Sequence, residues 1–264
     1  MGEVKSESEA RETYFPISID IFQIDKILNF DLYIRTGRNK EYVLYRSKDL
    51  PIEAKDIAHL RERGIEVLYA KREDSVHYRK YLENNLKEIL SDKSIPPQKK
   101  SEVLYTVTTQ AVKEMLEDPR ASDLVPRSQH IVEASINYFL RENVAFECML
   151  KVLSFDYYTH THSVNVSMFA IFLGREVGLE DFELLRFGMG ALLHDLGKCK
   201  VDPSIVNFPG KLSPEQFEQM KKHPVYGVEI LTQEQKVNDE IILDVVKHHH
   251  EKLNGRGYPE GLKG

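Results

Sequence analysis

Tryptophan is absent from this 264-residue sequence, and cysteine occurs only twice, as Cys148 and Cys199. Two cysteines cannot form a disulfide framework, and so low a number fits a reducing compartment. No apolar run approaches the length of about 20 residues that a membrane-spanning helix needs. The polar, acidic start of the chain, residues 1–12, also excludes a secretory signal. These absences predict a cytoplasmic protein that does not use a membrane.

The sequence also has no excess of basic residues over acidic ones. Lysine and arginine total 36 against 42 aspartates and glutamates, which gives a formal net charge of −6. Nucleic-acid-binding proteins usually carry a basic surface, so this balance argues against a nucleic-acid partner. Hydrophobic residues make up 41% and charged residues 30%, which is typical of a globular protein with a buried core. The length allows one large domain or two smaller ones.

The first part of the chain predicts a small α+β module over residues 13–75, after a disordered tail over residues 1–12. Short aromatic and β-branched runs at 31–35 and 41–46 flank a segment that contains Gly and Asn, which is typical of a β-hairpin. This module carries no catalytic motif, and its role and its ligand stay open.

Two further elements complete the module. Pro51 and Gly64 bracket an expected helix over residues 52–63, because proline is favoured at the first turn of a helix and glycine just past the end. Residues 65–69 are expected to form a third strand.

After residue 75 the apolar residues recur at helical spacing, and no further strand is predicted. We expect residues 76–150 to form a helical connector or the start of a bundle, and residues 151–264 to form a helical domain. Ser213 and Pro214 mark one helix start, with serine as the N-cap and proline at the first position. The fold class is therefore mainly α, with a small α+β module in front.

Histidine is concentrated late in the chain, where seven of the ten histidines lie between His160 and His250. Five of these histidines and one aspartate stand at four places in the sequence that are about 30 residues apart, on or at the ends of expected helices. They are His162, His194, Asp195, His223, His249 and His250. A helical bundle can assemble a metal site from residues this far apart in sequence. The remaining histidines are expected to lie at the surface or in the core without a ligand role.

The chemistry of this set favours a transition metal. Several imidazoles with a carboxylate suit iron, manganese or zinc, whereas magnesium and calcium prefer oxygen ligands. Asp195 has two carboxylate oxygens and can therefore bridge two metal ions. Paired metals are suited to the hydrolysis of phosphate esters.

Local motifs make the signal specific. His194-Asp195-Leu196-Gly197-Lys198 follows an apolar helix, and His249-His250-Glu251 leads into Asn254-Gly255-Arg256-Gly257-Tyr258-Pro259. From about Asp156 to Gly264 the sequence resembles the HD-GYP branch of the HD phosphohydrolase superfamily. The resemblance implies an all-helical HD-type bundle, two divalent metal ions, favouring iron or manganese, and hydrolysis of cyclic di-GMP to pGpG or GMP in bacterial signalling.

The resemblance also implies a role for each matching residue. Those that match His162 and His194 hold one metal, Asp195 bridges, and those that match His223, His249 and His250 hold the second metal. Asp195 and Lys198 are the implied catalytic residues, and Lys198, Gly257 and Tyr258 are the implied substrate contacts. Tyr158 stands where members with a third metal carry glutamate, which favours two metals. Implied partners beyond cyclic di-GMP are a diguanylate cyclase or another signalling protein, and a second copy of the chain.

Two departures from the family pattern keep alternatives open. Asn254 replaces the usual aspartate of the Gly-Tyr-Pro motif, and the sequence stops at Gly264, where the family continues with helices that supply another metal-binding aspartate and basic residues. The resemblance therefore implies a C-terminally truncated domain, and we expect this chain to be at best a feeble hydrolase. The alternatives are a catalytically impaired signalling or interaction module, and an HD hydrolase of another phosphoester.

Overall fold

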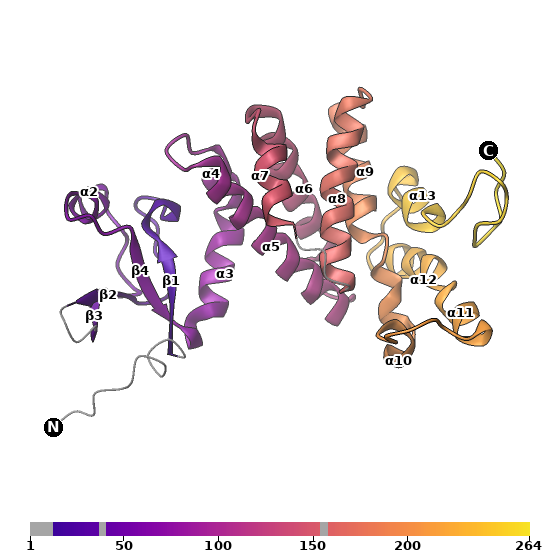
Figure 1. Cartoon of the computed structure of the whole chain (residues 1–264), viewed down its shortest axis with the longest axis horizontal. Coiled ribbons are helices and arrows are strands. Elements are labelled where there is room, and N and C mark those ends of the chain that lie inside the picture. The colour runs from indigo at the N-terminus through magenta and orange to yellow at the C-terminus, as the bar shows by residue number, and fades with distance from the viewer. Residues whose placement is uncertain (1–12, 37–40, 154–157) are drawn as a thin grey trace. The chain divides into compact units, whose positions relative to one another are not determined.

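The computed structural model describes residues 13–36, 41–153 and 158–264. The tail predicted over residues 1–12, the turn of the predicted hairpin and the first residues of the HD-GYP resemblance lie outside these ranges. The described residues form two compact units that divide between Val103 and Leu104 (Figure 1). None of the described helices combines the length and the apolarity that a membrane crossing requires.

The first unit is built on a four-stranded antiparallel sheet. Its strands are β1 (Tyr14–Ser18), β2 (Leu32–Thr36), β3 (Glu41–Arg46) and β4 (Val67–Lys71), in the spatial order β1-β4-β2-β3. The pairing of β2 with β3 confirms the predicted hairpin. β4 confirms the predicted third strand, shifted by two residues toward the C-terminus.

Strand β1 was not predicted from the sequence. It lies at the edge of the sheet and pairs with β4, so that Tyr14 lies opposite Lys71. Pro16 interrupts its sequence pattern, yet an edge strand tolerates proline because one side of its backbone needs no partner in the sheet.

Helices and short 3-10 turns make up the rest of this unit. They are α2 (Ala54–Glu62), α3 (Ser75–Asn84), α4 (Leu86–Ser91) and the first residues of α5 (Pro97–Glu117), with short 3-10 turns η1 (Ile19–Ile21) and η2 (Arg72–Asp74). α2 confirms the predicted helix after Pro51. The sheet and the helices bury a common core that includes Ile17, Phe30, Leu32, Leu60 and Leu68.

The second unit is helical. After the remainder of α5 it contains α6 (Leu124–Arg141), α7 (Ala145–Val152), α8 (Thr159–Glu176), α9 (Asp181–Leu193), η3 (Leu196–Lys200), α10 (Pro203–Val206), α11 (Pro214–Met220), α12 (His223–Glu229), a π-helical turn η4 (Ile230–Glu234) and α13 (Glu240–His248). Segment 76–150 thus contributes helices to both units. The fold class, mainly α with a small α+β part in front, is confirmed.

Helix α9 is the central helix of the second unit and contacts α6, α8 and α13. Most of its apolar residues, among them Leu184, Met189 and Leu192, are buried, as a helix surrounded by others requires, whereas Phe182 at its start is exposed. Gly190 lets α13 approach closely, because a Cβ at this position would lie 2.7 Å from the side chain of Val245. The end of α9 therefore delivers residues 194–195 into the interior between these helices.

The predicted helix start at Ser213 is also confirmed. The Ser213 hydroxyl accepts a hydrogen bond from the backbone N–H of Gln216, and the Gln216 side chain accepts one from the backbone N–H of Ser213. This reciprocal capping box fixes the start of α11. α11 and α12 follow each other almost directly, so the start of α12 places His223 opposite the end of α9.

Candidate metal centre

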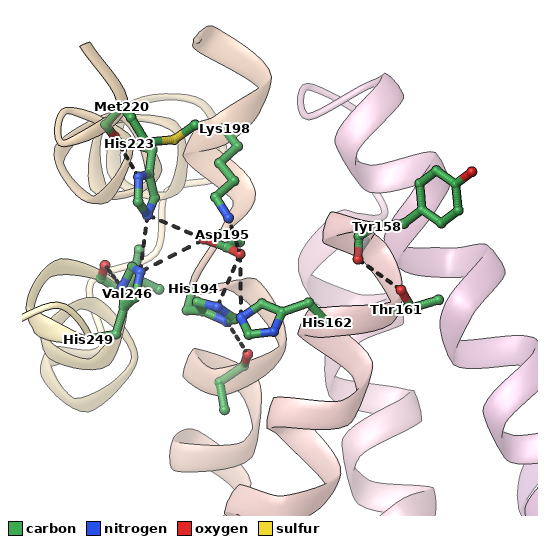
Figure 2. A network of polar contacts seen from close by, with 11 residues as sticks. Tyr158, Thr161, His162, His194, Asp195, Lys198, Met220, His223, Val246 and His249 are labelled. Atoms are coloured by element: carbon green, nitrogen blue, oxygen red, sulfur yellow. Dashed lines mark hydrogen bonds and ion pairs between the residues drawn. The ribbon is translucent and has the colours of Figure 1, made fainter. Parts of the chain in front are cut away.

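Asp195 is the central residue of the candidate site. It directly follows His194 at the end of α9, and its side chain is only 1% exposed. Both carboxylate oxygens face histidine nitrogens, and each oxygen faces a different group of rings (Figure 2). A buried carboxylate needs compensating partners, so these neighbours define what Asp195 can do.

One group of ligand atoms lies at Oδ2 of Asp195. The Nε2 atoms of His194 and His162 lie 3.3 Å and 3.9 Å from this oxygen. Lys198, one turn further along η3, donates a hydrogen bond to the same oxygen at 2.7 Å. The candidate ligand atoms of His162, His194 and Asp195 all lie within 4.8 Å of one another, close enough to share one metal ion.

The second group lies at Oδ1 of Asp195. The Nε2 atoms of His223 and His249 lie 3.3 Å and 3.8 Å from this oxygen. His250 completes the group, in which all four candidate ligand atoms again lie within 4.8 Å of one another. α8, the end of α9, the start of α12 and the end of α13 thus bring together all six residues that the sequence predicted as metal ligands.

The orientation of three rings is set by the backbone. Nδ1 of His194 lies 2.8 Å from the carbonyl of Ala191, Nδ1 of His223 lies 2.7 Å from that of Met220, and Nδ1 of His249 lies 2.9 Å from that of Val246. A carbonyl only accepts, so Nδ1 carries the proton in each ring, a tautomer that follows from the hydrogen-bond network. Each ring therefore directs the Nε2 lone pair toward Asp195.

These tautomers give a test of whether a metal fits. Nε2 of His223 lies 3.1 Å from Nε2 of His249 and 3.3 Å from Oδ1 of Asp195, and in these tautomers all three atoms are acceptors. Oδ1 is fully buried and accepts no hydrogen bond from the described residues. Converging lone pairs without a donor are unfavourable, whereas a divalent cation satisfies all of them at once. The residues therefore fit a divalent metal.

The charge states also suit metal binding. Burial lowers the pKa of His249 to about 3, and burial lowers the pKa of His250 to about 4, with neighbouring imidazoles acting in the same direction. Burial likewise lowers the pKa of His162. For Asp195 burial acts to raise the pKa, but the adjacent His194, His223 and Lys198 outweigh burial and hold the pKa well below the usual value. At neutral pH His162, His249 and His250 are thus neutral imidazoles and Asp195 is a carboxylate, the forms that bind metals.

Gly197 explains how α12 comes so close to Asp195. A Cβ on Gly197 would lie 2.0 Å from the backbone carbonyl of His223 and 2.4 Å from the backbone nitrogen of Gly227. No larger residue fits this contact between η3 and α12. The glycine of the His-Asp motif therefore places His223 within reach of Asp195.

The Gly-Tyr-Pro loop lies beside the second group. The Tyr258 ring stacks on the His250 ring, with centroids 4.6 Å apart and an interplanar angle of 27°. Gly257 packs against the backbone of Glu251 and Lys252, where a Cβ would lie 2.4 Å from the nearest atoms. Direct substrate contact by Gly257 or Tyr258 stays a prediction.

A cavity of about 550 Å³ opens onto the site. Its lining includes His162, Asp195, Lys198, His249 and His250. His248, which the sequence analysis left outside the ligand set, contributes to the wall, but its ring nitrogens contact Asp244 and Glu260. Glu251 belongs to the His-His-Glu motif but was not among the predicted site residues. Its carboxylate holds the loop together by accepting hydrogen bonds from three backbone N–H groups.

Comparison with known proteins gives an independent view of the same region. Residues 159–263 match the family model described as the HD domain. The chain is 37% identical over 147 residues to cyclic di-GMP phosphodiesterase PA4108 of Pseudomonas aeruginosa, a match that covers 56% of this chain and 34% of that protein. It is 34% identical over 108 residues to a cyclic di-GMP phosphodiesterase of Thermotoga maritima, which covers 41% of this chain and 29% of that protein.

A third relative differs in its named substrate. The 3'3'-cGAMP-specific phosphodiesterase 2 of Vibrio cholerae is 35% identical over 106 residues, 40% of this chain and 20% of that protein. The chain thus spans about a third or less of the length of these curated relatives.

Among solved structures, the fold is similar to that of Bd1817, a HDG"Y"P protein from Bdellovibrio bacteriovorus. The TM-score is 0.61 at 23% identity, over 95% of this chain and 81% of that chain. Residues 159–263 therefore match an HD domain, and this part of the chain is similar to relatives named as cyclic di-GMP phosphodiesterases.

Proposed function

We propose that this protein hydrolyses cyclic di-GMP to pGpG or GMP in bacterial signalling, with two divalent metal ions bound at Asp195. The observation that carries the proposal is the division of the Asp195 carboxylate, because one oxygen faces His162 and His194 while the other faces His223, His249 and His250. The relatives named as cyclic di-GMP phosphodiesterases support the substrate.

Each metal would have its own set of histidine ligands, and the two metals would share only Asp195. The second set has three imidazoles and the first has two, and this nitrogen-rich shell with one bridging carboxylate favours iron or manganese over magnesium. When bound, such a pair supplies Lewis acidity and lowers the pKa of a water molecule, which is the chemistry that phosphodiester hydrolysis requires.

The side chains of the protein itself supply the lone pairs for the metals and a cation for the substrate. His249 and His250 are neutral near pH 7 because burial depresses the pKa values of these two rings, so their lone pairs are available without loss of a proton. Lys198 has no lone pair to offer as an ammonium, so it cannot be a ligand in this form. Its amine, 2.7 Å from Oδ2 of Asp195, is close enough to the bridge to donate to a phosphate oxygen of the substrate.

A second candidate substrate is 3'3'-cGAMP. The relative from Vibrio cholerae named for this substrate matches at 35% identity, close to the identities of the cyclic di-GMP phosphodiesterases. Both molecules are cyclic dinucleotides with the same phosphodiester linkage to break. The metal ligands give no reason to prefer one substrate over the other, so turnover of each must be measured.

The test is hydrolysis by purified protein. The chain is prepared anaerobically, loaded with iron or manganese, and incubated separately with cyclic di-GMP and 3'3'-cGAMP, and the products are separated by chromatography. We expect slow formation of linear dinucleotide from cyclic di-GMP, and no product from the Asp195→Asn variant at the same metal concentration. Metal binding without turnover of either substrate would contradict the proposal and favour a signalling module or another phosphoester.

A further inference from the structure

We propose that Glu251 is a positioning residue, which holds the Gly-Tyr-Pro loop so that Tyr258 keeps the His250 ring aimed at the second metal position. The inference rests on the proposed function, because it treats His250 as a metal ligand. Glu251 directly follows His250 in the sequence, so a displacement of Glu251 also moves the backbone of His250.

The Glu251 carboxylate closes the loop by three hydrogen bonds. Oε1 accepts from the backbone N–H groups of Glu260 and Gly261 at 2.6 Å and 3.0 Å, and Oε2 accepts from that of Leu262 at 3.0 Å. Three consecutive backbone donors thus converge on one carboxylate. Hydrogen bonds to an ionised acceptor are about twice as strong as neutral ones, so the three together hold the end of the loop to Glu251.

Within the second group, His250 depends on the loop more than His223 and His249 do. His194, His223 and His249 each make an Nδ1 hydrogen bond to a backbone carbonyl, but the His250 ring makes none with the residues that the structure describes. Its ring is held by neighbours instead, with the Tyr258 ring at 4.6 Å and the His249 ring at 4.2 Å between centroids. The backbone N–H of Tyr258 also donates to the carbonyl of His250 at 3.3 Å.

A second clamp on the same loop is weaker. The Glu260 carboxylate contacts Lys247 and His248 on α13, at side chains that are 44%, 36% and 21% exposed. Exposed ion pairs contribute about 0–1 kcal/mol to stability. We therefore expect Glu251 and not Glu260 to set the position of Tyr258.

The experiment compares Glu251→Ala and Glu251→Gln with Tyr258→Ala, with the double variant Glu251→Ala/Tyr258→Ala, and with Glu260→Gln as a matched control on the same loop. The first readout uses the metal-free protein. Diethyl pyrocarbonate modifies accessible neutral histidines, and mass spectrometry gives the rate at each one. His59, in the other unit, serves as the internal reference.

We expect His250 to react several-fold faster in Glu251→Ala and in Tyr258→Ala, with an unchanged rate at His59. The double variant should react no faster than the faster single variant, because both changes release the same ring. Glu260→Gln should leave the rate near that of the unchanged protein. If Glu251→Ala fails to fold, Glu251→Gln retains one acceptor oxygen and should show a smaller increase of the same kind.

The second readout is cobalt affinity, measured by titration of the full chain. We expect the affinity of one of the two sites to fall about 10–100-fold in Glu251→Ala, as is typical when a group that orients a ligand is lost. An unchanged His250 rate together with unchanged cobalt affinity would overturn the proposal, as would additive effects in the double variant. Neither readout uses hydrolysis, so a failure of the proposed function is recognised separately, as metal binding without turnover.

Discussion

The Nε2 atoms of His223 and His249 lie 3.1 Å apart, although the hydrogen bonds of both rings to backbone carbonyls leave each of these nitrogens without a proton. Two acceptors at this separation do not stabilise each other. The same two rings also face Oδ1 of Asp195. A cation among the three atoms makes this arrangement favourable. Because the two ligand groups share only Asp195, the two halves of the site are separable by mutation.

Removal of one ligand from each half should remove one metal ion. We expect His223→Ala to lose the ion on the Oδ1 side, His194→Ala to lose the ion on the Oδ2 side, and Asp195→Ala to lose both. Metal content per chain, measured by elemental analysis, checks this. Hydrolysis should fall by at least about 10²–10³ in each variant, as when a single transition-state contact is removed.

His160→Ala is the control for these variants, because the His160 ring stacks on Tyr158 outside the ligand groups. It should keep both metals. Loss of both ions from either single histidine variant would contradict the division of Asp195 between two separate positions.

Lys198→Ala should separate substrate binding from metal binding. The lysine donates to Oδ2 of Asp195 but is no ligand, and its removal frees that oxygen for the metal. We therefore expect metal content to be retained, with a higher KM or a lower kcat for cyclic di-GMP. Lys198→Arg should recover part of the loss because the charge is kept. Loss of metal in Lys198→Ala would show that the ammonium helps to build the site.

Gly197→Ala should destabilise the second unit and disconnect His223 from Asp195. A methyl group 2.0 Å from the carbonyl of His223 forces η3 and α12 apart, and overpacking of this kind commonly costs about 1–3 kcal/mol in the free energy of unfolding. Urea unfolding and metal content both report the change. At Gly210 a Cβ would meet only the Phe208 ring, at 3.2 Å, so Gly210→Ala is the matched control with a small expected effect.

Acid should destabilise the metal-free chain through the half-buried His249 and His250. The pKa values of His249 and His250 in the folded state are about 3 and about 4, below the ordinary 6.5, so the unfolded chain binds more protons between these limits. The free energy of unfolding therefore falls as the pH drops from about 6.5 toward about 3–4. Urea unfolding in a chelator at about pH 7 and about pH 5 measures this difference.

The matched variant for the pH experiment is His249→Gln, which removes the more strongly shifted of the two groups. Its stability should depend less on pH over the same interval. An equal slope for both proteins would show that other groups carry the acid sensitivity.

Local patterns predicted most of the helices and all six candidate ligands, because capping residues and apolar spacing act over a few residues and the ligand motifs are contiguous. Ser213 and Pro214, for example, mark the start of α11 in the sequence and in the structure. Strand β1 was missed because its pairing with β4 joins residues far apart in the chain, which no local pattern encodes. The carboxylate of Glu251 was missed for a related reason, since its three partners become neighbours only when the loop folds back.

The ends of α9 and α13 have an electrostatic consequence beyond the placement of ligands. His194 and His249 stand at the C-caps of these helices, and each uses Nδ1 to bind a carbonyl of the last turn. The C-terminal end of a helix carries about half a negative charge from the aligned peptide dipoles. Two such ends converge on Asp195 and add to the negative charge of its carboxylate, whereas the start of α12 brings partial positive charge to the same place. Added salt should therefore slow metal capture more than it speeds metal release.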